Sequence, residues 1–592
     1  MKPRSWFYHT LVCCLALVMS QCATRSGSTG SSSSEIPHLR KQGTATQLIV
    51  DGKPFLALAG ELGNNTATSL EYMKLVWPKL VASKLNTVLA GVSWGQIEPQ
   101  EGKFDFSVLE GVIDGARSHN LRLVLLWFAT WKNGLSSYPP DWVKRDFERF
   151  PRAQIVGDNT SWPVFGGVRA PVTGSLNIEL LSPFGEATRD ADARAFAALM
   201  RHIKAVDSQQ HTVIMIQVEN EVGMQGDTRD RSPAANKAFE GPVPKELMDY
   251  LQQHKDTLIP ELRKVWEAAG FKTSGTWQEV FGKGRPTDEI FMAWYFSRYV
   301  GRVIEAGKAE YPIPMYTNCP QTGFGRERVA GRGVGQGGGP MPDAMDVWRA
   351  GAPRLDVFGV DIYNPDFVAM CARYTQSGNP LFIAETRGFP PYGLEARVLY
   401  AFGRHDAIGF SPMGIERPTT PDIELTSSYG VIAQLAPLIL EHQGNGTMSA
   451  VVLGPNDPPQ KVRVGNYTLE AGFVTPRALP GSPPPPEPFP NSAAIFIATG
   501  PDEFYAAGNG VTVTFTPNTP GPPLAGLATV EEGTFVNGRW VPGRRLAGDD
   551  AGQGQNLVLP RLHVVESPLG WTGGLAGPST KGIQRVTLYR YR

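Results

Sequence analysis

Cysteine and surplus charge are scarce in this sequence, and each shortage excludes a class of protein. Of the 592 residues only 5 are cysteine, and Cys13, Cys14 and Cys22 lie in the first 22 residues. The other two, Cys319 and Cys371, are too few for a disulfide framework or a cysteine-based metal cluster. We expect them to be buried free thiols. The 56 basic residues equal the 56 acidic ones, which excludes the basic excess of a nucleic-acid-binding protein.

The signatures of metal and phosphate sites are also missing. The nine histidines do not show the His-x-x-x-His spacing of a metal site. Gly338-Gly339-Pro340 lacks the lysine and the spacing of a phosphate-binding loop. Gly91–Gly95 does match the Gly-x-Ser-x-Gly elbow of serine hydrolases, but no clear helix follows it directly. We therefore expect no metal and no cofactor.

The first 22 residues have the composition of an export signal. Lys2 and Arg4 are followed by the apolar stretch Leu11–Met19, which is too short to span a bilayer. Cys22 stands where bacterial lipoproteins carry their lipid-modified cysteine, although Gln21 occupies a position usually held by a small residue. Residues 23–45 begin with a Ser/Gly-rich run and are expected to be a flexible tether. The predicted protein is exported: periplasmic, anchored to the outer membrane through a lipid, or secreted.

Strand-like and helix-like segments alternate over residues 46–420, which is typical of a parallel α/β protein. The helix candidates Glu71–Lys84, with Ser69 as its N-cap, and Val108–Ser118 lie between strands. Eight strands with helices between them predict a closed (β/α)8 barrel. The strand candidates are Phe55–Ala59, Asn86–Ala90, Arg122–Trp127, Val213–Val218, Pro314–Thr317, Val357–Asp361, Leu381–Glu385 and Ala407–Ser411.

The pattern changes after about residue 420. A helix candidate over Tyr429–Gln443 contains Pro437, which would kink or shorten it. Short alternating segments then predict a smaller β-sandwich over residues 421–592. We expect this domain to support the barrel without supplying a catalytic group. The strand candidates are Ala450–Leu453, Ala493–Thr499, Phe504–Ala507, Val511–Phe515 and Gln584–Tyr589.

Two strands of the predicted barrel end in a carboxylate. Glu221 follows the apolar run Val213–Val218, and Glu385 ends the strand candidate Leu381–Glu385. The C-terminal ends of barrel strands form the catalytic face, so both side chains are expected there. Cleavage of a glycosidic bond needs such a pair. One carboxyl protonates the leaving oxygen, and the other attacks the anomeric carbon or activates a water.

Longer stretches around these residues resemble one group of enzymes. Gln217–Gly223 (QVENEVG) is similar to the acid/base motif of glycoside hydrolase family 35. Trp94–Phe106 (WGQIEPQEGKFDF) resembles a stretch of β-galactosidases in families 35 and 42. The resemblance covers roughly residues 45–420. It implies a retaining β-galactosidase that needs no cofactor and releases terminal β-galactose from oligosaccharides or polysaccharide side chains.

The resemblance also implies roles for single residues. Glu221 would be the acid/base, Glu385 the nucleophile, and Asn220 would bind the sugar 2-hydroxyl. Glu219 is the rival acid/base, but period-two alternation places its side chain on the opposite face from Asn220. Asp361, at the end of another strand, is the rival nucleophile.

Five further side chains are candidates for binding the substrate. Glu61 and Glu98 would contact sugar hydroxyls, and a loop salt bridge is the alternative for both. Tyr363 would touch the nucleophile or the sugar. Trp94 and Trp131 crowd the loops after the second and third strands, where aromatic faces can stack on a pyranose.

One segment departs from the family 35 pattern. Thr130 stands where many members carry the glutamate of an Ala-Glu-Trp element that binds galactose. That sugar contact is either missing or replaced by Lys132 or Asn133. The alternatives are therefore a β-glycosidase for another sugar, such as arabinopyranose, fucose or glucose, and a non-catalytic glycan-binding surface protein.

Two more expectations concern the surroundings of the site. An ion pair with Arg387 is the alternative role for Glu385. The irregular insertions Tyr138–Leu181 and Gly331–Pro342 follow strands and are expected to shape the rim of the active site.

Overall fold

A computed structural model provides the fold. It describes residues 35–592 except 157–162, 165–166, 169–174, 225–226, 321–336, 364–365, 389–391, 420, 455, 474–491 and 560–581. The predicted export signal and Cys22 lie outside the described residues. So do parts of both predicted rim insertions, 138–181 and 331–342.

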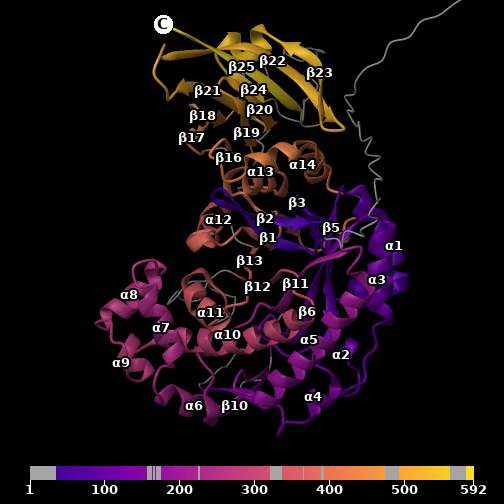
Figure 1. Ribbon diagram of the computed structural model, residues 1–592, viewed down its shortest axis with the longest axis vertical. Helices are drawn as coiled ribbons and strands as arrows, with labels where there is room; N and C mark the ends of the chain where they lie inside the picture. Colours follow the sequence, from indigo (N-terminus) through magenta and orange to yellow (C-terminus); the bar gives the residue numbers. More distant parts are fainter. Residues whose placement is uncertain are drawn as a thin grey trace, which may run out of the picture. The chain divides into compact units, whose positions relative to one another are not determined.

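Eight parallel strands close into a barrel, and helices such as α1 (Leu70–Ala82), α3 (Ser107–Ser118) and α10 (Arg285–Glu310) lie around it (Figure 1). Each of the eight strands expected from the sequence is present, with ends shifted by a few residues, so the predicted barrel is confirmed. Neighbours in the barrel follow chain order, and the last strand pairs with the first. The strands are β4 (Ala57–Glu61), β5 (Thr87–Ser93), β6 (Arg122–Lys132), β11 (Val213–Asn220), β12 (Met315–Pro320), β13 (Val357–Ile362), β14 (Phe382–Thr386) and β15 (Gly409–Pro412).

A helix follows every barrel strand. Ser69 caps the first helix as predicted, because its hydroxyl accepts a hydrogen bond from the backbone N–H of Tyr72 at 3.3 Å. The helices, in the order of the strands that they follow, are α1 (Leu70–Ala82), α3 (Ser107–Ser118), α5 (Glu186–Asp207), α10 (Arg285–Glu310), α11 (Met345–Gly351), α12 (Phe367–Tyr374), α13 (Leu394–His405) and α14 (Ile423–His442).

The connections between barrel strands carry additional short elements. They include the antiparallel pair formed by β7 and β10 and a group of four helices after β11. The elements are η1 (Thr66–Thr68), α2 (Trp94–Ile97), α4 (Asp141–Arg145), β7 (Arg152–Val156), β8 (Pro163–Val164), β9 (Gly167–Val168), β10 (Ser175–Leu181), α6 (Pro233–Glu240), α7 (Lys245–Gln253), α8 (Pro260–Ala268), α9 (Trp277–Phe281), η2 (Pro342–Ala344) and η3 (Gln376–Gly378).

A small antiparallel sheet precedes the barrel: β1 (His38–Gln42), β2 (Ala45–Val50) and β3 (Lys53–Phe55). Leu48 and Val50 of β2 belong to the same buried cluster as the residues that fill the barrel interior. The fold thus begins inside the range that was expected to be a tether, because the apolar residues of β2 need a paired strand and a core to pack against.

The turn between β1 and β2 packs against a segment about four hundred residues further along the chain. The N–H of Thr44 donates to the carbonyl of Gly444 at 3.1 Å. A Cβ atom at Gly43 would lie 2.4 Å from that same carbonyl oxygen, so only glycine fits there. The amide of Gln47 donates to the carbonyl of Leu440 at 2.6 Å. The first strands and the end of α14 are therefore held together.

Two antiparallel sheets form the C-terminal domain. Their facing sides share one buried core that includes Phe496 and Phe504 from one sheet and Leu469 and Phe515 from the other, which confirms the predicted sandwich. In pairing order the larger sheet contains β16 (Met448–Leu453), β19 (Ser492–Gly500), β20 (Glu503–Asn509), β25 (Ile583–Tyr591), β22 (Leu524–Val536) and β23 (Arg539–Leu546). The smaller one contains β17 (Gln460–Val464), β18 (Tyr467–Phe473), β21 (Val511–Pro517) and β24 (Leu557–Leu559), and η4 (Gly548–Gly554) lies before β24.

Helices α13 and α14 join this domain to the barrel (Figure 1). Gly403 of α13 lies so close to the larger sheet that a Cβ atom there would be 2.7 Å from the Cβ of Ala450. On α14, the side chain of Gln434 accepts a hydrogen bond from the N–H of Phe535 at 3.0 Å. Helix α14 continues through Pro437 to His442. Its length and composition would suit a membrane span, but here one of its faces is packed inside the protein.

We expect Tyr429→Phe to destabilise the protein. The hydroxyl of Tyr429 on α14 donates towards the carbonyl oxygens of Ala59 and Phe410, at 2.7 and 3.1 Å, and the ring is fully buried. Removing the hydroxyl leaves buried carbonyl groups without their donor, which costs about 1–2 kcal/mol. Urea unfolding measures the change. Tyr72→Phe is the control, because Tyr72 is 53% exposed on α1. Equal stabilities of both variants would contradict the expectation.

Candidate active site

Four carboxylates gather at the C-terminal ends of the barrel strands. We call Glu61, Glu221, Asp361 and Glu385 the carboxylate cluster. Each is at most 6% exposed, and they come from β4, the residue after β11, β13 and β14. Burial raises the pKa of Glu61 well above its usual value, and the charges of Glu385 and Glu221 raise it further. The predicted catalytic pair thus lies in one electrostatically coupled group.

The end of β11 has an unusual backbone. Glu219 and Glu221 have φ angles of +61° and +47°, a left-handed conformation that is uncommon for residues with a side chain. The N–H of Glu221 donates to the side-chain oxygen of Asn318 at 3.1 Å. The side-chain O and N of Asn220 are both buried and have no hydrogen-bond partner among the described residues. Because an unpaired buried amide is costly, its partners are expected to come from a ligand.

Only one carboxylate oxygen of Glu385 has a hydrogen-bond partner among the described residues. The hydroxyl of Tyr363 donates to Glu385 Oε1, and Oε2 is buried without a partner in the described part of the chain. Burial, and then the charge of Glu385, raise the pKa of Tyr363, which keeps this donor protonated. Arg387 is exposed and donates to the sulfur of Met413 at 3.4 Å. Among the described residues Glu385 forms no ion pair with Arg387.

Asp361, the rival nucleophile, is hydrogen-bonded to Asn318. Its Oδ2 accepts a hydrogen bond from the amide of Asn318 at 2.7 Å. Burial raises the pKa of Asp361 well above its usual value, and the charges of Glu385 and Glu221 add to this shift. A carboxyl group that favours its neutral form is a poor nucleophile. Asp361 is therefore a weak candidate for the nucleophile and is better suited to donating a hydrogen bond.

Glu219 points away from the carboxylate cluster. Its two oxygens accept the backbone N–H groups of Thr130 at 3.2 Å and Trp131 at 2.6 Å. It also shares a side-chain hydrogen bond with Asp192 of α5, and burial raises the pKa of both carboxyls. Asp192 accepts hydrogen bonds from the indole of Trp127 at 2.9 Å and the hydroxyl of Thr130 at 2.7 Å. We call Asp192 and Glu219 the rear carboxyl pair. They bind the end of β6 and have no place in the cluster.

Lys132 is a cation whose charge acts on the cluster. Its side chain is 6% exposed, and its ammonium nitrogen lies 4.8 Å from the ring centre of Phe128. Burial by itself would lower the pKa of this ammonium group, but the charges of Glu385, Glu221 and Glu61 outweigh burial and raise it. Thr130 faces Asp192 instead. Thr130, the residue at which the sequence departs from the family 35 pattern, thus points away from the carboxylate cluster. Lys132 points towards the cluster.

Three predicted sugar-binding residues are not brought into the cluster. The indole of Trp94 donates to Glu98 Oε2 at 2.8 Å, and the N–H of Gly102 donates to Glu98 Oε1 at 2.7 Å. This part of the sequence motif therefore braces its own loop. Trp131 is fully buried, and its indole donates to the carbonyl of Leu181 at 3.0 Å.

Two residues near the cluster were not predicted. Asn318, near the end of β12, bonds to both Glu221 and Asp361. Glu416, after β15, accepts from the N–H of Gly63 at 2.9 Å and the hydroxyl of Thr66 at 2.7 Å, and its charge acts on Glu61. Both follow the rule used for Glu221, a polar residue at or beyond a strand end, but no motif marked them.

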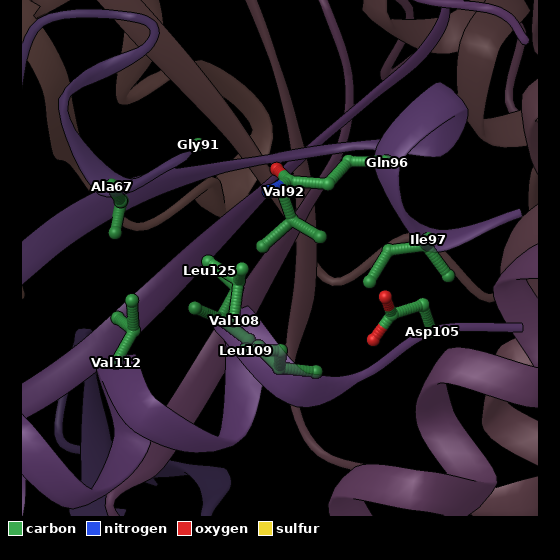
Figure 2. A pocket seen from close by; sticks show the side chains of 11 residues that line it. Ala67, Gly91, Val92, Gln96, Ile97, Asp105, Val108, Leu109, Val112 and Leu125 are labelled. Atoms are coloured by element: carbon green, nitrogen blue, oxygen red, sulfur yellow. The ribbon is translucent and has the colours of Figure 1, made fainter. Parts of the chain in front are cut away.

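A hollow between β5 and α3 lies apart from these residues (Figure 2). Apolar side chains such as Val92, Leu109 and Leu125 line most of it. Its polar groups have partners in the protein: Gln96 donates to the carbonyl of Thr68, and Asp105 accepts the N–H of Ser107. Because it contains no member of the cluster, we regard it as a gap in packing.

Glu221 and Glu385 follow or end β11 and β14, on the face of the barrel where the glycosidase resemblance placed them. Residues 77–282 match the family model described as β-galactosidase, glycoside hydrolase family 42. This segment is similar to the β-galactosidases of that family, which confirms the resemblance seen in the motifs. Residues 425–558 match a domain of unknown function, DUF5597. They cover α14 and most of the sandwich.

Individual relatives are distant. A β-galactosidase of Xanthomonas manihotis is 28% identical over 193 residues, which is 31% of this chain and 26% of the relative. The chain therefore spans about a quarter of that relative's length. Crystal structures of β-galactosidases from Rahnella sp. R3 and Bacillus circulans are 17% and 16% identical, with TM-scores of 0.41 and 0.42. In both cases 65% of this chain and 57% of the other chain are covered.

Substitutions in the rear carboxyl pair and in the carboxylate cluster should have different effects on the stability of the protein. We expect Glu219→Ala to lower the free energy of unfolding by about 2–5 kcal/mol, because two buried N–H groups lose their acceptor. Glu221→Ala removes one of several like charges from the cluster, so its stability should equal or exceed that of the wild type. Thermal unfolding of both variants is the measurement. Equal destabilisation by the two changes would contradict the different roles of Glu219 and Glu221.

Proposed function

We propose that the protein is an exported, retaining β-galactosidase that releases terminal β-galactose from oligosaccharides or polysaccharide side chains. The observation that carries the proposal is the carboxylate cluster, in which Glu221 and Glu385 stand at the ends of β11 and β14. The family match over residues 77–282 supports the same chemistry.

In the proposed reaction Glu385 attacks the anomeric carbon, and Glu221 protonates the leaving oxygen. Glu221 then removes a proton from the water that hydrolyses the glycosyl-enzyme. Tyr363 holds one oxygen of Glu385, which orients the other oxygen for attack. In a retaining enzyme the two carboxyl groups are about 5 Å apart, whereas a separation of roughly 9 Å would leave room for a water and indicate inversion.

A second candidate differs only in the sugar. Thr130 faces the rear carboxyl pair, so residue 130 does not make the contact that many family 35 members make through a glutamate at this position. This favours keeping arabinopyranose, fucose and glucose as alternatives to galactose. A purely glycan-binding protein is less well supported, because it would not need a coupled cluster of acidic groups.

Export is the part of the proposal that rests on sequence alone. Lys2, Arg4 and the apolar stretch Leu11–Met19 support passage across a membrane, and Cys22 supports a lipid anchor. Fractionation of cells that produce the full chain, compared with the variant Cys22→Ser, separates an anchored protein from a released one.

We expect the wild-type enzyme to hydrolyse 4-nitrophenyl β-D-galactopyranoside faster than the corresponding glucoside, fucoside and arabinopyranoside. The first sugar released, observed by NMR, should be the β anomer, because double displacement retains configuration. Release of the α anomer would exclude the double-displacement mechanism. Faster turnover of another glycoside would assign the enzyme to that sugar.

The two glutamates should respond differently to substitution. Glu385→Ala should abolish turnover, and azide or formate should restore part of it by replacing the nucleophile. Glu221→Ala should slow substrates with poor leaving groups by about 10²–10⁴-fold, because only these need the acid, and should slow activated aryl glycosides much less. Steady-state kinetics with both substrate types provides the test. An equal loss on both types would contradict the role of Glu221.

A further inference from the structure

Lys132 has a position that the proposed reaction does not explain. It is the last residue of β6, it is buried, and the charges of the carboxylate cluster act on it. The nucleophile and the acid need no cation of their own in double displacement. An ammonium group retained among these carboxylates therefore calls for a separate role.

A β-bulge in β6 places Lys132 beside the carboxylate cluster. In the pairing of β11 with β6, Trp127 lies opposite Val218 and Lys132 lies opposite Asn220, so two steps along β11 correspond to five along β6. The rear carboxyl pair fixes this bulge, because Glu219 accepts the N–H groups of Thr130 and Trp131. Thr130 is thereby turned outwards, and Lys132 arrives beside Asn220.

Asn220 and Lys132 are neighbours on adjacent strands, about 4.8 Å apart along the hydrogen-bonding direction. Beyond β6 the barrel continues through β5 to β4, which carries Glu61. Consider a pyranose whose C1 lies between Glu221 and Glu385. Its successive ring carbons would lie along the ends of β11, β6, β5 and β4. With the 2-hydroxyl at Asn220, the 3-hydroxyl comes next, at Lys132.

Donor and acceptor chemistry fits this arrangement. An ammonium group only donates hydrogen bonds, and a hydroxyl both accepts and donates. Glu61 Oε1 is buried without a partner in the described part of the chain. A sugar hydroxyl could thus accept a hydrogen bond from Lys132 while the sugar donates one to Glu61 Oε1, which would gain the partner that it lacks among the described residues.

We infer that Lys132 is a specificity-determining residue that donates a hydrogen bond to the 3-hydroxyl of the terminal sugar, next to the 2-hydroxyl held by Asn220. This inference rests on the proposed function, since it requires a pyranoside in the cluster. Many family 35 members contact the sugar through a glutamate at position 130. Because Thr130 points away from the cluster here, the inference assigns a sugar contact to Lys132 instead.

The test compares substrates that differ by one hydroxyl. We would measure kcat/KM for 4-nitrophenyl β-D-galactopyranoside and its 2-deoxy and 3-deoxy analogues with the wild type, Lys132→Met and Lys132→Arg. Loss of a hydrogen bond to a charged group should slow the wild type on the 3-deoxy substrate by about 10- to 100-fold. In Lys132→Met this 3-deoxy penalty should disappear, and the 2-deoxy penalty should remain. Lys132→Arg should keep part of the 3-deoxy penalty.

Two controls keep the result interpretable. Lys74→Met changes an exposed lysine of α1 and should leave every ratio unchanged. If Lys132→Met is too slow to assay, calorimetric binding of phenyl 1-thio-β-D-galactopyranoside and its 3-deoxy analogue gives the same comparison without turnover.

The outcomes separate the two proposals. A wild type without turnover of any β-glycoside would overturn the proposed function, and the inference with it. Normal turnover with an undiminished 3-deoxy penalty in Lys132→Met would overturn the inference alone. Disappearance of the 2-deoxy penalty instead of the 3-deoxy penalty would also overturn it.

Discussion

The electrostatics at the C-terminal ends of the barrel strands depend on a single requirement. Several acidic side chains must be buried together without their mutual repulsion destabilising the fold. Like charges at short range disfavour ionisation, and the pKa values of Glu61 and Asp361 are raised accordingly. Lys132 is held among them as a counter-charge. The raised pKa values favour the neutral forms of Glu61 and Asp361, which can then donate hydrogen bonds within the cluster.

A second set of acidic groups, behind the first, holds this arrangement in place. The rear carboxyl pair binds the backbone of β6 through Glu219 and the side chains of Trp127 and Thr130 through Asp192. It sits directly behind the left-handed backbone at the end of β11. The strand that carries the acid/base candidate and the strand that carries the cation are thus fixed to each other by one buried hydrogen-bonded unit. Catalytic geometry of this kind requires such support from behind.

Much of the fold could be predicted because local sequence patterns determine where its strands and helices lie. Eight apolar runs such as Val213–Val218 marked the barrel strands, and the cap Ser69 marked the start of α1. The bulge in β6 could not be predicted, because alternation assumes an unbroken register and gives no sign of the shift between Trp127 and Lys132 against β11. The motif around Trp94 and Glu98 was matched correctly, but matching letters does not separate a residue that contacts sugar from one that braces a loop. Strands β22 and β23 were missed because few of their side chains are buried and the burial shows little alternation.

The contact between the β1–β2 turn and Gly444 has a consequence for how the protein is made. The strands that close one end of the barrel emerge early from the ribosome, but Gly444 and Leu440 are synthesised about four hundred residues later. Closure of the barrel by β15 against β4 has a similar separation. The early strands must wait in a partly formed state for most of translation, with apolar residues such as Leu48 uncovered. The N-terminal strands therefore reach their native packing only after α14 has been completed.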